Sequence, residues 1–139
     1  MKITTVTDSF AVSPQIRPED VPRLAADGYT TVINNRPDGE APDQPPGAAI
    51  AKACDEAGLS YVDLPFAHTD FQPELVRGMR AAIDAADGKV FAFCRSGTRS
   101  YTLWALATVK SEADLAAKIE RAAEQGFDIN ASRVLARLM

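Results

Sequence analysis

The stretch that decides the fold occupies residues 89–104 and reads KVFAFCRSGTRSYTLW. It opens with a short run of β-branched and aromatic residues, Val90 to Phe93, which is typical of a buried strand. After a small polar loop, apolar residues recur at helical spacing from Leu103 onward, beside Trp104. The stretch therefore predicts a strand, a tight loop and a helix in direct succession, with Cys94 where the strand ends.

Cys94 is the candidate nucleophile of this loop. A thiol between a strand and a helix lies at the helix N-terminus, where unpaired N–H groups and the helix dipole favour a thiolate and a bound anion. Gly97 permits successive N–H groups to turn inward, and Arg99 supplies a planar fork of donors for a tetrahedral oxyanion. A lone cysteine at a strand end is most often a structural thiol, but the residues that follow this one favour catalysis. We therefore predict Cys94 and Arg99 as catalytic and, as substrate-binding residues, Arg95, Ser96, Gly97, Thr98 and Ser100.

Two further stretches narrow the interpretation. Residues 10–16 read FAVSPQI and residues 32–40 read VINNRPDGE, while the loop itself, residues 94–100, reads CRSGTRS. Together the three resemble the bacterial DUF442 family, the phosphatase-like domain of beta-lactamase-hydrolase-like proteins, which is also labelled a sulfurtransferase family. The resemblance runs from Ile3 to Val109 and implies a fold similar to that of dual-specificity phosphatases.

Composition limits the class of protein. A chain of 139 residues, 46% hydrophobic and 24% charged, predicts a single globular domain over residues 1–139. A net charge of −4 argues against nucleic acid as a partner. The absence of a long apolar run or a signal pattern, with only two cysteines, predicts a cytoplasmic protein that does not associate with membranes. We expect no cofactor and no metal site.

The order of elements predicts an α/β fold. Helical and strand-like segments alternate, which is typical of a three-layer domain with a mostly parallel central sheet and helices on both faces. Two segments are apolar on both faces and should be interior strands, namely residues 29–33 and 90–93. Short strands are expected at residues 3–6, 10–13 and 59–66, and helices beginning at Pro18, Pro46 and Pro73 and after the N-cap Ser111, with a last helix capped by Asn130.

The loop at residues 34–47 follows a predicted interior strand, at the sheet edge where open α/β folds place their ligands. Arg36 leaves that strand and can reach an anion in the crevice, so we predict it as substrate-binding. Asp38 and Glu40 are expected to be solvated turn residues. Cys54 shares the apolar face of the next helix with Ile50, which favours a core thiol over a resolving partner for Cys94.

The resemblance to phosphatases also implies a general acid, which protonates the leaving group. Phosphatases of the resembling class keep an aspartate on a loop after a strand, and the matching position here is His68, with Asp70 two residues later. Both are therefore predicted as catalytic residues, and the sequence leaves open which of them acts.

Two reactions share Cys94. The phosphatases that the family resembles have five residues between the cysteine and the arginine and a histidine before the cysteine, whereas this chain has four and Phe93. These departures are similar to rhodaneses and favour sulfur transfer through a Cys94 persulfide, with thiosulfate or a persulfide as donor and a thiol as possible acceptor. The alternative is hydrolysis of a phosphomonoester through a Cys94 thiophosphate, and a third hypothesis is a catalytically silent anion-binding domain.

Overall fold

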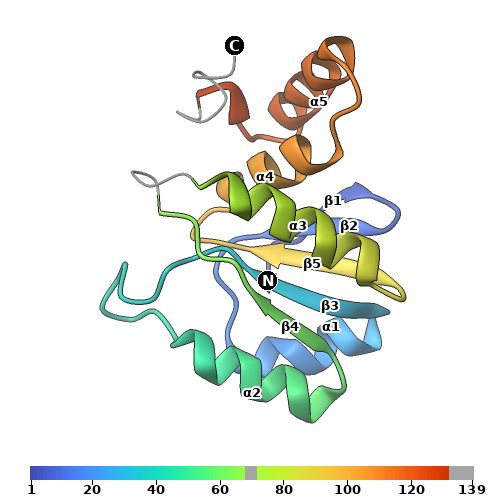
Figure 1. Ribbon diagram of the computed structural model, residues 1–139. Coiled ribbons are helices and arrows are strands. Elements are labelled where there is room, and N and C mark those ends of the chain that lie inside the picture. Colours follow the sequence, from blue (N-terminus) through green and yellow to red (C-terminus); the bar gives the residue numbers. More distant parts are fainter. Residues whose placement is uncertain (68–71, 132–139) are drawn as a thin grey trace.

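The computed structural model describes residues 1–67 and 72–131. Five strands form one sheet in the order β1-β2-β5-β3-β4 (Figure 1). Strands β2, β5, β3 and β4 are parallel to one another, and β1 runs antiparallel to β2 at one edge. The strands are β1 (Thr4–Thr7), β2 (Phe10–Ser13), β3 (Tyr29–Asn34), β4 (Ser60–Asp63) and β5 (Lys89–Phe93).

Helices cover both faces of this sheet, so the predicted three-layer α/β architecture is confirmed (Figure 1). Helices α1 and α2 pack on one face and α3 and α4 on the other, and α5 packs against α4. The helical segments are η1 (Pro18–Asp20), α1 (Val21–Ala26), α2 (Gly47–Ala57), α3 (Pro73–Ala85), α4 (Thr98–Thr108), α5 (Glu112–Glu124) and η2 (Ile129–Ala131).

Strand β5 is the centre of the molecule, with β2 on one side and β3 on the other. Its side chains alternate between the two layers: Phe91 and Phe93 pack toward α1 and α2, and Val90 and Ala92 pack toward α3 and α4. All four are buried. A strand covered on both faces has no polar face, which is why the continuous apolar run correctly predicted an interior strand.

Local signals also fixed the ends of several helices. Pro73 is the first residue of α3, and the Oγ of Ser111 caps α5 by accepting the N–H of Asp114 at 3.0 Å. Cys54 is fully buried among apolar residues, and burial raises the pKa of its thiol to about 11, as expected for a core cysteine. Of the predicted last helix, only the start around Asn130 falls among the described residues, in η2.

Candidate active site

Three neighbouring strands of the sheet end beside one another, and the chain segments that follow them form the candidate site. Ser13 of β2, Phe93 of β5 and Asn34 of β3 pair with one another across the sheet. Gln15, Cys94 and Arg36 each lie one or two residues beyond the end of one of these strands. The three residues are therefore located at the same edge of the sheet. This is the carboxyl edge of the parallel strands, where open α/β sheets bind ligands.

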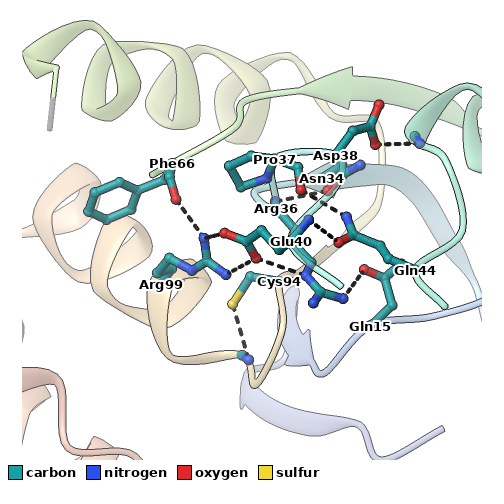
Figure 2. Close-up of polar contacts among 12 residues, drawn as sticks. Gln15, Asn34, Arg36, Pro37, Asp38, Glu40, Gln44, Phe66, Cys94 and Arg99 are labelled. Carbon is teal, nitrogen blue, oxygen red and sulfur yellow. Dashed lines mark hydrogen bonds and ion pairs between the residues drawn. The ribbon is translucent and has the colours of Figure 1, made fainter. Parts of the chain in front are cut away.

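Cys94 follows the last residue of β5 and is the first residue of the short loop that leads into α4. Gly97, the N-cap of α4, has φ of +96°, a backbone conformation that glycine adopts without strain. Its N–H donates a hydrogen bond to the Sγ of Cys94 at 3.1 Å (Figure 2). Both residues are buried. The sulfur of Cys94 and the first N–H group of the helix therefore face each other, where an N–H group is also available to a bound anion.

Arg99 lies in the first turn of α4, and its guanidinium is held by hydrogen bonds to Phe66 and Glu40. Its Nη1 donates to the carbonyl oxygen of Phe66 at 2.7 Å and to Oε2 of Glu40 at 2.8 Å, and its Nη2 donates to Oε1 of Glu40 at 2.7 Å. Burial lowers the pKa of Arg99, but the Glu40 carboxylate and the neighbouring Cys94 thiol together raise it above its usual value. The guanidinium is thus a fixed cation next to the sulfur.

Glu40 corrects one of our expectations. The sequence predicted a solvated turn residue, and the residue as a whole is exposed, but its side chain is only 23% exposed and its carboxylate lies between two guanidinium groups (Figure 2). Besides Arg99, the Nε of Arg36 donates to Oε1 of Glu40 at 2.9 Å. The hydrogen bonds from Arg99 lower the pKa of Glu40 to about 2, although partial burial opposes this. Glu40 is therefore an ionised carboxylate that joins the two arginines.

Arg36 extends the site toward β2. Its side chain is 5% exposed, and its Nη1 donates to Oε1 of Gln15 at 3.1 Å. The backbone N–H of Gln15 in turn donates to the carbonyl oxygen of Arg95 at 3.4 Å, within the loop of Cys94. Gln15 was not among the predicted site residues. Its position in the FAVSPQI stretch was the signal available, since Gln15 lies two residues beyond the strand expected at residues 10–13.

The loop between β3 and α2 is held by hydrogen bonds of its own. Asp38, exposed as predicted, accepts the N–H of Gly47, the first residue of α2, at 2.8 Å. Gln44 accepts the N–H of Glu40 at 3.0 Å and donates to the carbonyl oxygen of Pro37 at 2.8 Å. These bonds fix the backbone at Glu40, so its carboxylate is placed before any ligand arrives.

The other predicted site residues differ in exposure. Arg95 and Ser96 are exposed, and Thr98 is half-buried. Ser100 is fully buried, and its Oγ has no hydrogen-bond partner within the described part of the chain. His68 and Asp70 lie outside the described residues. Across residues 1–67 and 72–131 there is no cluster of His, Cys, Asp and Glu that could hold a metal, and no helix long and apolar enough to span a membrane.

Replacing Glu40 with glutamine should change the acid stability of the fold. The folded-state pKa of about 2 lies below the value of about 4.3 for an unfolded chain. The ionised carboxylate therefore contributes stability that is complete above about pH 5 and is lost as the pH falls toward about 2. Urea unfolding should show wild type more stable than Glu40→Gln at about pH 7, with a narrower gap at about pH 3.

The matched control is Glu74→Gln, because Glu74 pairs with Arg77 at 2.9 Å on an exposed part of α3. That change should alter the free energy of unfolding very little at either pH. An equal gap between wild type and Glu40→Gln at both pH values would contradict the ionised, bridging state of Glu40.

Comparison with known proteins decides the family. Residues 2–112 match the family described as beta-lactamase hydrolase-like protein, phosphatase-like domain. The chain belongs to this family. A beta-lactamase hydrolase-like protein of Xylella fastidiosa is 37% identical over 109 residues, which are 78% of this chain and 25% of that protein. The chain thus spans about a quarter of the length of the curated relatives it matches.

Solved structures place the phosphatase-like domain among phosphatase folds. The crystal structure of a Neisseria meningitidis protein, described as a candidate phosphatase, is 31% identical with a TM-score of 0.77, covering 93% of this chain and 92% of that one. The fold is also similar to that of Pseudomonas aeruginosa TpbA, crystallised with phosphotyrosine, at 15% identity and a TM-score of 0.59, covering 96% and 88% of the two chains. The family and the Neisseria structure support a thiol-dependent, phosphatase-like enzyme.

Proposed function

We propose that the protein is a cysteine-dependent phosphatase acting on a small anionic phosphomonoester. The observation that carries this proposal is the Gly97 N–H on the Sγ of Cys94, with the Arg99 guanidinium next to that sulfur. The family and the solved relatives support phosphoryl transfer over sulfur transfer. The order of the two reactions predicted from the sequence is therefore reversed.

In the proposed reaction, the Cys94 thiolate attacks phosphorus and forms a thiophosphate, and water then releases phosphate. The three hydrogen bonds of Arg99 to Glu40 and Phe66 use both hydrogens of Nη1 and one of Nη2. Its Nε and the second Nη2 hydrogen are then the donors that remain for the Cys94 sulfur and for the anion, together with N–H groups of the loop. Arg36 adds positive charge to the site, and Arg95, Ser96, Thr98 and Ser100 are proposed to bind substrate oxygens.

The leaving alkoxide or phenoxide requires a proton. His68 and Asp70 are the proposed donors, because they follow β4 on the loop that resembles the general-acid loop of phosphatases. The carbonyl oxygen of Phe66, just before them, accepts from Arg99. The start of this loop is therefore tied to the anion-binding arginine.

Sulfur transfer is the second candidate, and the length of the loop favours it. Only four residues separate Cys94 and Arg99, and the position before the cysteine is a fully buried Phe93 and not a histidine. A shorter loop offers fewer N–H groups to a phosphoryl group bonded to sulfur. A sulfane sulfur needs less room, and sulfite leaves from thiosulfate as a stable anion without a general acid.

A paired assay separates these candidates. We expect the purified protein to hydrolyse aryl phosphates, and we expect either His68→Ala or Asp70→Ala to slow poor leaving groups far more than good ones. Incubation with thiosulfate, followed by intact mass and then by cyanide, tests for one added sulfur on Cys94 that is released as thiocyanate. A persulfide without phosphate hydrolysis would place sulfur transfer first. If neither a persulfide nor phosphate hydrolysis is detected, the remaining hypothesis is a catalytically silent anion-binding domain.

A further inference from the structure

Phe127 contacts the active loop from a part of the chain that the family match does not include. It follows α5, beyond the matched residues 2–112. A Cβ atom added at Gly97 would lie 3.0 Å from Cε1 and 3.5 Å from Cζ of Phe127, and 3.5 Å from the backbone carbonyl carbon of Ser13. The ring therefore packs directly against the glycine whose N–H bonds to the nucleophile, and the end of β2 closes the same space.

Several contacts hold the Phe127 ring in place. Its centroid is 5.4 Å from that of Tyr101, and its backbone N–H donates to the carbonyl oxygen of Ala122 at 2.8 Å. Gln125 accepts the hydroxyl of Tyr101 at 2.6 Å and donates to the carbonyl oxygen of Thr5 at 2.8 Å. The end of α5 is thus tied both to α4, the helix that begins at the loop, and to the edge strand β1.

We propose that Phe127 is a positioning residue for the nucleophile, which keeps the Gly97 N–H directed at the Sγ of Cys94. Glycine with a positive φ has more than one accessible backbone orientation, and only one of them points the N–H at sulfur. The ring fills the space into which Gly97 would otherwise move. Without it, the thiolate loses a hydrogen-bond donor and the loop loses an N–H group for an anion.

Alkylation of Cys94 by iodoacetamide tests this inference without any substrate. In Phe127→Ala, the rate at about pH 6 should fall about fivefold, the value of one net hydrogen bond, while the rates of variant and wild type converge at about pH 9.5. Convergence at high pH shows that access to the thiol is unchanged and that the slower reaction at low pH comes from the lost N–H contact with sulfur. Labelling is followed at the Cys94 peptide by mass spectrometry, so Cys54 does not contribute.

Two variants serve as controls. Phe127→Leu retains an apolar contact and should show the same change in smaller degree, which keeps the test decisive if Phe127→Ala does not fold. Ile129→Ala removes a fully buried side chain from the same segment, although the atoms nearest a Cβ at Gly97 belong to Phe127 and Ser13. It should leave the ratio of rates at the two pH values unchanged.

An unchanged ratio in a folded Phe127 variant, or an equal change in Ile129→Ala, would overturn the positioning role. Because both phosphoryl and sulfur transfer use the Cys94 thiolate, this result does not depend on which reaction the protein performs. Failure of the proposed phosphatase activity would therefore leave it intact.

Discussion

Cys94→Ser is expected to abolish turnover, with a fall of at least about four orders of magnitude in kcat/KM. A hydroxyl is not ionised near neutral pH, so the serine cannot attack phosphorus or sulfur at a useful rate. The fold should persist, because serine is no larger than cysteine and can still accept the N–H of Gly97 that now bonds to sulfur at 3.1 Å. Activity assays, with circular dichroism and thermal unfolding as the measure of the fold, check both statements.

The chain provides its own control in its second thiol. Cys54 is fully buried among residues of α1 and α2, on the face of the sheet opposite to α4. Cys54→Ala should keep activity within about twofold and lower the free energy of unfolding by about 1 kcal/mol. Comparable loss of activity in both cysteine variants, or residual activity in Cys94→Ser near that of wild type, would remove Cys94 from the catalytic role.

Arg99→Lys is expected to lower kcat/KM by about a hundredfold to a thousandfold, as when one donor of an oxyanion site is lost. The guanidinium bonds at once to both carboxylate oxygens of Glu40 and to the carbonyl oxygen of Phe66, and leaves donors for the substrate. A lysine ammonium has three donors on one atom and cannot hold all these partners in one plane. Steady-state kinetics should show the loss mainly in kcat, because the developing charge is greatest in the transition state.

Arg77→Lys is the matched control for this arginine, since Arg77 lies on the exposed face of α3 with its side chain 70% exposed. It should leave kcat/KM unchanged. Full activity in Arg99→Lys would contradict the anion-binding role of Arg99. A loss confined to KM would indicate that the arginine contributes equally to ground-state and transition-state binding.

Local sequence determined much of the fold. The strand at Lys89–Phe93 and the strand at Tyr29–Asn34 were predictable because a run that is apolar on both faces is stable only in the interior of a sheet. Proline and glycine marked helix ends, because each restricts or permits particular backbone angles wherever it occurs. The Cys94–Arg99 loop was also visible, since its members are nearly contiguous and one turn of backbone brings them together.

The tertiary structure alone decided the partners of that loop. Arg99 pairs with Glu40, 59 residues away, and Phe127 packs on Gly97, yet neither contact has a local signal. The motif around Arg36 did not reveal whether Asp38 or Glu40 would turn inward. That choice depends on the position of Arg99, which follows a different strand. Strand order fixes this position: β2, β5 and β3 lie side by side and end in register. Pairing between distant strands is set by burial in the whole core, which no single stretch of sequence contains.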